Sequence, residues 1–335
     1  MINTISLFSG SGGLDLGLLK TKKFKIILAN DFDKSACESY SHNIGKHIVH
    51  GDIKELTNLP KAELIVGGPP CQGFSTANPN RAFEDPRNWL FKEYCRIISE
   101  VSPKVFLMEN VSGILTLENG KVFNIIKKEF QNLGYTLYES LLNAKYYEVP
   151  QSRNRVILVG VRNDINVKYE FPSPISNPPL FGRFITVGDA ILNFSFEKDD
   201  PNHSISKLTE LNLKRIKHIP EGGSMKDCPQ ELQNNSDLKR SMRRLDSRKP
   251  SYTIVHNNCD HYYHPKENRR ITIREMALLQ TYPSDYVFKG SKSDQSKQVG
   301  NSVPINLGFH LGLSLNDLFE KIQKQKVSKR KLIEV

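Results

Sequence analysis

Short apolar runs alternate with amphipathic segments over the first 160 residues of the chain. Val122, Ile126 and Phe130 recur at helical spacing, and Gly134 ends that run. The apolar runs predict buried strands at residues 4–8, 25–29, 63–67, 104–109 and 155–160, with weaker candidates at 47–49 and 135–142. This alternation predicts an α/β fold with a doubly wound, mostly parallel sheet and helices on both faces. Ligands of such sheets bind beyond the carboxyl ends of the strands.

The pattern changes at "FPSPISNPP" (171–179), a stretch rich in Pro and Ser that marks a boundary. The chain is loop-rich from there to about residue 270. Helical periodicity then returns in 272–280, and a final amphipathic helix is expected over 304–322. We therefore predict a first domain of 1–172 completed by 300–322, a second, smaller, loop-rich domain with a hinge at 173–299, and a basic tail at 323–335.

The composition favours an anionic partner. The 335 residues carry a formal net charge of +11, and residues 239–274 hold ten basic and three acidic side chains. Such a patch is typical of proteins that bind nucleic acid, although solvated faces also carry charge. The five cysteines are scattered without a CxxC pair, which argues for a reducing compartment. With no signal-peptide pattern and no apolar run of about 20 residues, we expect a cytoplasmic protein that does not enter a membrane.

A glycine-rich turn, "LFSGSGGLDLG" (7–17), follows the first expected strand and opens a helix. Gly10, Gly12 and Gly13 let a ligand approach the backbone closely. The dinucleotide fingerprint would need a third glycine where Asp15 stands, which disfavours a nicotinamide dehydrogenase. The turn alone does not identify its ligand.

Acidic residues follow the next strands. Asp31 and Asp52 each end an expected strand, and either one alone could simply cap a helix. Together with the glycine-rich turn, they indicate a ligand that carries a nucleoside but needs no phosphate clamp.

Charged residues also lie at the ends of two later strands. Glu109 ends a strongly apolar strand, where a carboxylate needs a partner or a task. Arg153 and Arg155 are two residues apart and share one face of an extended segment. They could equally be ion-paired surface arginines.

The stretch "GGPPCQGFST" (67–76) holds one thiol rigidly. Its two prolines fix the backbone before Cys71, so that the loop aims this side chain. A buried, inert thiol remains the alternative on this stretch alone. Elsewhere, the group of His256, Cys259, His261 and His264 lacks the paired spacing of a zinc site, and we predict no metal.

These pieces occur in a recognisable order: FSGSGG, GGPPCQGFS, ENV, QSRNRV, a variable region, RRITIREMALLQTYP and QVGNSVP. In this order they closely resemble the DNA (cytosine-5)-methyltransferases of bacterial restriction–modification systems. The resemblance covers most of the chain apart from roughly residues 175–250 and the tail. It makes the first domain catalytic and cofactor-binding, with the S-adenosylmethionine-dependent methyltransferase fold, and the second domain the one that recognises the target.

The resemblance implies a mechanism. Cys71 would attack C6 of a cytosine flipped out of the duplex, which makes C5 able to accept a methyl group. Glu109 would hold the protonated N3 edge, Arg155 would bind the oxygen at C2, and Arg153 would support the site. The methyl donor would be S-adenosylmethionine. Its expected contacts are Phe8, Gly10, Ser11, Gly12, Asp31, Phe32, Asp52, Ile53, Pro70, Leu90, Asn301 and Ser302.

Double-stranded DNA is the implied partner, read by basic and aromatic side chains of the second domain. The residues expected to bind it are Gln72, Ser75, Gln151, Arg243, Arg244, Arg248 and Tyr252. The resemblance further implies a monomer that protects DNA from a cognate restriction endonuclease. Two alternatives stay open: a tRNA cytosine-5 methyltransferase, which would share the catalytic residues, and a DNA-binding regulator that has lost catalysis.

Overall fold

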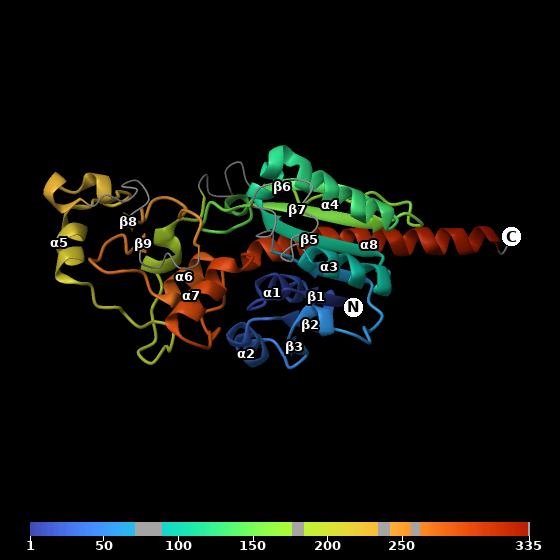
Figure 1. Cartoon of the computed structure of the whole chain (residues 1–335), viewed down its shortest axis with the longest axis horizontal. Coiled ribbons are helices and arrows are strands. Elements are labelled where there is room, and N and C mark those ends of the chain that lie inside the picture. Colours follow the sequence, from blue (N-terminus) through green and yellow to red (C-terminus); the bar gives the residue numbers. More distant parts are fainter. Residues whose placement is uncertain (71–88, 176–183, 234–241, 256–261, 334–335) are drawn as a thin grey trace.

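The computed structural model describes residues 1–70, 89–175, 184–233, 242–255 and 262–333. Its main element is a seven-stranded sheet with the order β3-β2-β1-β4-β5-β7-β6 (Figure 1). The strands are β1 (Ile2–Leu7), β2 (Phe24–Asp31), β3 (Ile48–His50), β4 (Leu64–Gly67), β5 (Val105–Val111), β6 (Tyr135–Asn143) and β7 (Asn154–Arg162). Only β7 runs against its neighbours in this sheet. The predicted α/β, mostly parallel sheet is confirmed, including both weaker strands.

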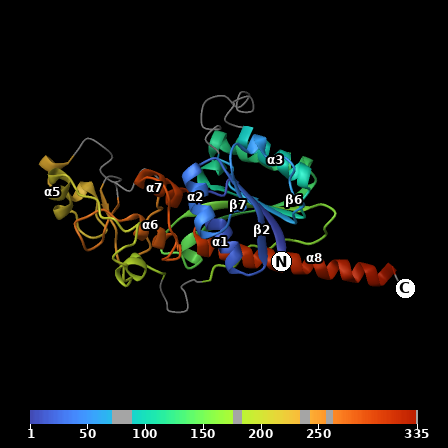
Figure 2. The same cartoon turned by 90° about the horizontal axis from the view of Figure 1, so that it is seen from below.

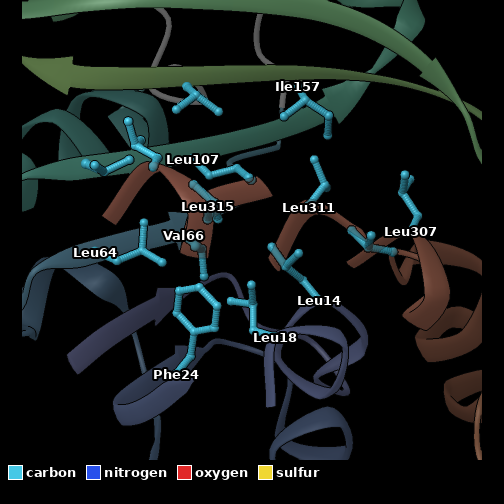
Figure 3. Packing of buried hydrophobic residues seen from close by; sticks show 14 of the residues in the cluster. Leu14, Leu18, Phe24, Leu64, Val66, Leu107, Ile157, Leu307, Leu311 and Leu315 are labelled. Carbon is cyan, nitrogen blue, oxygen red and sulfur yellow. The ribbon is translucent and has the colours of Figure 1, made fainter. Parts of the chain in front are cut away.

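Helices cover both faces of the sheet. One face packs against α1 (Gly13–Lys20) and α8 (Ile305–Ile333), whose leucines meet those of the strands (Figure 3). The other face packs against α3 (Trp89–Val101) and α4 (Lys121–Asn132) through a core rich in aromatic rings. Figure 2 shows α3 and α8 on opposite sides of the sheet. The smaller α2 (Lys34–Asn43) follows β2.

Helix α8 packs closely against α1, because a glycine in each helix allows their backbones to come into contact. A Cβ on Gly17 of α1 would lie 2.5 Å from the carbonyl carbon of Gly308 in α8, closer than real contacts allow. Helix α8 thereby completes the layer that α1 begins. The helix continues to Ile333, so much of the expected tail prolongs it beyond the sheet (Figure 1).

The region between residues 184 and 301 lies beside the carboxyl ends of the strands (Figure 1). It holds α5 (Glu210–His218), α6 (Ile273–Leu279), α7 (Lys292–Asn301) and a two-stranded sheet of β8 (Arg243–Arg244) and β9 (Tyr262–Tyr263). We call it the small region. Helix α6 matches the helix expected over 272–280. Two small apolar clusters form its core. The domain boundaries proposed above remain a prediction.

Short helical turns complete the connections. They are Ile53–Glu55, Ser112–Leu115, Leu117–Gly120, Ala144–Tyr146, Gly188–Leu192, Met225–Asp227 and Gln230–Leu232. Among the helices that the structure describes, none is both long enough and apolar enough to cross a membrane.

Candidate active site

The reversed direction of β7 brings distant residues to one edge of the sheet. Parallel strands place their carboxyl ends there, and β7 begins there because it runs the other way. Val111, at the end of β5, pairs with Arg155 near the start of β7. Asp31, Glu109 and Arg155 therefore share the edge at which ligands bind in this class of fold.

The glycine-rich turn occupies this edge in a strained conformation. Gly10 and Gly12 have φ angles of 53° and 77°, and the bulky Phe8 also lies in the left-handed region at 55°. A non-glycine residue in that region costs about 1–3 kcal/mol and tends to mark functional sites. A Cβ added to Gly10 would meet nothing within 4 Å, so this part of the turn faces open space.

Asp31 fixes the turn, and Asp52 caps a helical turn. Asp31 accepts hydrogen bonds from the backbone N–H of Gly10 at 2.7 Å and of Asp33 at 2.8 Å. Burial raises the pKa of the Asp31 carboxyl, and these two bonds oppose that rise. Asp52 instead accepts from the backbone of Lys54 at 2.9 Å, as a helix cap does.

The other residues expected around the cofactor differ in their exposure. Phe32 directly follows Asp31 and is 77% exposed, an unusual state for a large aromatic ring. Ile53 is buried and Leu90 half-buried against the core, whereas Pro70 and Asn301 are exposed. Ser11, between the two glycines of the turn, and Ser302, between α7 and α8, are buried.

Glu109 and Arg155 form an ion pair. Arg155 Nε lies 2.6 Å from Glu109 Oε1, and their side chains are only 10% and 12% exposed. Glu109 Oε1 accepts no hydrogen bond from the residues that the structure describes, so the two side chains attract each other by charge alone. Glu109 Oε2 faces the loop before Cys71, because a Cβ on Gly68 would lie 3.0 Å from it.

Asn110 is a residue that the sequence analysis missed. Its buried side chain donates from Nδ2 to the carbonyl oxygen of Pro69 at 2.9 Å. The residue thus anchors the strand end that leads into Cys71. Asn110 is the middle residue of the ENV motif, so the motif is the sequence signal that could have identified it beside Glu109. Cys71, Gln72 and Ser75 lie outside the described residues.

Arg153 is a wholly buried cation and not a surface arginine. Its guanidinium donates to the carbonyl oxygens of Ile254 at 2.7 Å, Gly300 at 2.8 Å and Ser302 at 2.9 Å. Burial and the neighbouring Arg155 lower its pKa well below the usual range. Arg153 therefore joins the start of β7 to the small region and to the turn before α8.

The expectation that Gln151 contacts the substrate is corrected. Its buried amide donates to the carbonyl oxygen of Leu279 at 3.2 Å and accepts from the backbone of Ile254 at 3.0 Å. Both ends of the amide are therefore used to hold the small region against β7.

The expectation that Arg244 contacts DNA is also corrected. Its buried guanidinium donates to the carbonyl oxygens of Ile219 and Ile216 at 2.8 and 2.7 Å, and to the side chain of Asn268 at 2.6 Å. Further bonds reach the backbone of residues 264 and 267. A guanidinium used so fully inside the small region cannot reach DNA.

Other basic residues of 239–274 are also paired internally. Arg269 forms a bidentate ion pair with the buried Glu275, with hydrogen bonds of 2.7 and 2.8 Å. Arg274 forms another with Asp200 at 2.6 and 3.0 Å. Much of the charge that suggested a nucleic-acid surface therefore stabilises the small region, and fewer cations than the sequence indicates face outward.

Three of the expected DNA-contacting residues do lie at the surface. The Arg243 guanidinium lies 4.4 Å from the centre of the Tyr252 ring, and Tyr252 is exposed. Such stacking holds both side chains in place. The Arg248 side chain is 76% exposed and pairs with Asp246 at 3.0 Å.

Within the described part of the chain, no group of three or more His, Cys, Asp or Glu residues could hold a metal ion. Of the histidine–cysteine group, only His264 is described. It is buried, and its Nδ1 accepts from the backbone of Glu267 at 3.0 Å. His256, Cys259 and His261 lie outside the described residues.

A sheet of this order with a single reversed strand, and a glycine-rich turn beside an acidic strand end, define the S-adenosylmethionine-dependent methyltransferase fold. The profile of the C-5 cytosine-specific DNA methylases matches residues 2–317. The chain belongs to this family, as the motifs indicated.

Curated relatives are bacterial type II methyltransferases. M.Eco47II of Escherichia coli is 36% identical over 341 residues, which span 96% of this chain and 80% of that protein. M.FnuDI of Fusobacterium nucleatum is 36% identical over 334 residues, spanning 96% and 97% of the two chains. Among solved structures, Dnmt2 of S. pombe superposes with a TM-score of 0.66 at 21% identity, over 95% of this chain and 99% of that one. This last likeness concerns the fold.

Proposed function

We propose that this protein transfers a methyl group to C5 of a flipped-out cytosine within a short, specific duplex sequence. The Glu109–Arg155 ion pair beside the loop that leads to Cys71 carries this proposal, because it gathers a carboxylate and a cation where a cytosine edge must lie. Family membership supports DNA as the substrate.

Cys71 acts as the nucleophile. Its thiolate adds to C6 of the ring, and the electron pair of the C5–C6 bond becomes available at C5. The Arg155 and Arg153 cations, at the end of the sheet where the loop before Cys71 begins, favour the thiolate and oppose the charge that spreads into the ring. Once C5 has bonded to the methyl group, loss of the proton from C5 and expulsion of the Cys71 thiolate restore the aromatic base.

Glu109 holds the cytosine by its Watson–Crick edge. Its carboxyl group keeps a proton at N3 and accepts from the exocyclic amine, while Arg155 donates to the oxygen at C2. The ion pair fixes the direction of both side chains before the base arrives, which reduces the entropy lost in reaching the reactive geometry.

The residues of the sheet edge fit S-adenosylmethionine. The open space at Gly10 leaves room against the backbone, the Asp31 carboxylate suits ribose hydroxyls, and the exposed Phe32 offers a face for the adenine. When bound, this cofactor supplies an electrophilic methyl group on a sulfonium centre. Phe8, Ser11, Gly12, Asp52, Ile53, Pro70, Leu90, Asn301 and Ser302 complete the proposed site.

The proposed DNA surface is narrower than the sequence indicates. Arg243, Tyr252 and Arg248 remain as candidates from the small region, joined by Gln72 and Ser75 from the loop after Cys71. Gln151 and Arg244 are assigned instead to the support of this surface, since their polar groups are used internally. We further propose a monomer that works alongside a cognate restriction endonuclease.

Bisulfite sequencing tests this function. The gene is expressed in a bacterial host that lacks its own cytosine-5 methylation, and the host DNA is sequenced. We expect methylated cytosines at one short motif, and none when the Cys71→Ala variant replaces the wild type. Tritium transfer from labelled S-adenosylmethionine to duplex DNA and to tRNA then separates the two substrates. Transfer to tRNA alone would favour the alternative function.

A further inference from the structure

Two tyrosines from the small region form hydrogen bonds with Ser11 of the glycine-rich turn. Tyr282 OH lies 2.8 Å from Ser11 Oγ, and Tyr286 OH donates to the Ser11 carbonyl oxygen at 2.6 Å. Both oxygens of Ser11 are therefore held by side chains that are about 270 positions away along the chain.

Tyr282 also reaches a second residue of the proposed cofactor site. Its hydroxyl lies 2.7 Å from Ser302 Oγ, in the turn between α7 and α8. Ser302 in turn donates to the carbonyl oxygen of Val303 at 3.1 Å. One phenol group thus links Ser11, at the sheet edge, to Ser302, at the start of the last helix.

The surroundings of this hydroxyl chain are closely packed. A Cβ on Gly13 would fall 2.0 Å from Ser302 Oγ and 3.2 Å from Tyr282 OH, so glycine is needed there to make room for the hydroxyls. The Tyr282 ring packs against Tyr286 and Phe288, with centroids 4.8 and 4.9 Å apart. The packing therefore holds the phenol oxygen in one position.

The turn depends on such outside support. Helix α1 begins at Gly13, and its N-cap residue Gly12 provides no side-chain cap, although a capping side chain commonly fixes a helix start. Ser11 stands between Gly10 and Gly12, both in the left-handed region. Glycine loses the most backbone freedom on ordering, so this turn needs tertiary contacts to keep one shape.

We propose that Tyr282 is a positioning residue for the cofactor, whose hydroxyl holds Ser11 and Ser302 in the arrangement that binds S-adenosylmethionine. This inference rests on the proposed function, because it assumes that both serines contact the cofactor. Tyr282 is buried, and its hydroxyl contacts the side chains of Ser11 and Ser302. Its loss should weaken cofactor binding and leave the transfer step from the bound state nearly unchanged.

The test compares Tyr282→Phe with the wild type in the full-length protein. Loss of two hydrogen bonds of ordinary strength predicts a KM for S-adenosylmethionine that is about fivefold to 150-fold higher. The kcat should stay within about twofold and the KM for DNA should not change. Calorimetric titration with S-adenosylhomocysteine should show a matching loss of affinity.

Tyr135→Phe is the matched control. This buried hydroxyl donates to the carbonyl oxygen of Pro103 at 2.8 Å, at the opposite edge of the sheet, so its removal should leave both KM values unchanged. Ser302→Ala provides a second variant: combined with Tyr282→Phe, it should weaken binding less than the two separate effects predict.

Two results would overturn the inference, and they can be told apart. If folded Tyr282→Phe binds S-adenosylhomocysteine as the wild type does, the positioning role is wrong while the proposed function stands. If the wild type itself binds neither S-adenosylmethionine nor S-adenosylhomocysteine, the cofactor assignment fails and takes this role with it.

Discussion

Asp15, the residue that excluded a dinucleotide fingerprint, is a buried acid in the first turn of α1. Its carboxylate accepts from Ser6 Oγ at 2.7 Å and from Tyr40 OH at 2.8 Å. Burial raises its pKa from 3.8 to about 6, because the loss of solvation outweighs these two hydrogen bonds. This shift gives a prediction about stability.

The sign follows from which state binds the proton more tightly. The native state holds the Asp15 proton up to about pH 6, whereas the unfolded chain releases it near pH 3.8. The contribution to stability is therefore fully present below pH 3.8 and is lost as the pH rises through 6. At 1.36 kcal/mol for each pH unit, the loss amounts to about 3 kcal/mol.

Urea unfolding of the wild type and of Asp15→Asn, from pH 4 to pH 8, measures this loss. Asparagine has the same shape and does not ionise, and all other titrating groups are shared. The unfolding free energy of the wild type should therefore fall by roughly 2.5 kcal/mol relative to the variant across this range, because the first part of the loss occurs below pH 4.

Asp33→Asn is the control, because Lys297 and nearby donors keep the pKa of Asp33 at about 2 despite partial burial. Its curve should run parallel to that of the wild type between pH 5 and pH 8. Parallel curves for Asp15→Asn as well would refute the argument from burial.

Two further predictions concern the site. Glu109→Gln should lower kcat by about a hundredfold to ten-thousandfold in the tritium-transfer assay, because the amide cannot supply a proton at N3. Glu139 is an exposed glutamate that pairs with Lys127, and the control variant Glu139→Gln should retain full activity. Equal rates for both variants would contradict the role of Glu109. Arg244→Ala should lower the free energy of unfolding in urea by several kcal/mol, because it leaves buried carbonyl oxygens unpaired. Arg243→Ala should change this free energy by less than about 0.5 kcal/mol and should weaken binding in a DNA mobility-shift assay. The opposite order would return Arg244 to the DNA surface.

Periodicity alone located the sheet well. A strand buried on both faces is a run of apolar residues, and each such run in the first 160 residues became a strand. The sequence also indicated that Glu109 needs a partner, and it identified Arg155 on other grounds. What joins these two residues is the reversed direction of β7, which pairs Val111 with Arg155. No local pattern encodes that direction.

The arginines show where sequence reasoning reaches its limit. Arg243 and Arg244 are adjacent and chemically identical, but neighbouring residues of a strand point to opposite sides. One stacks on the exposed Tyr252, and the other fills the interior of the small region. Which side is interior depends on Ile216, Ile219 and other distant segments. Net charge therefore overstated the cationic surface.

The attack by the Cys71 thiolate is tested most directly by trapping it on DNA. A duplex that carries 5-fluorocytosine at the methylated position, once bisulfite sequencing has identified it, is incubated with the protein and S-adenosylmethionine. After methyl transfer, fluorine replaces the proton that must leave C5, so the sulfur–carbon bond should persist. The account predicts a covalent complex whose peptide map places the adduct on Cys71, and none with Cys71→Ala. A complex at another residue, or methylation of ordinary duplex by Cys71→Ala, would contradict it.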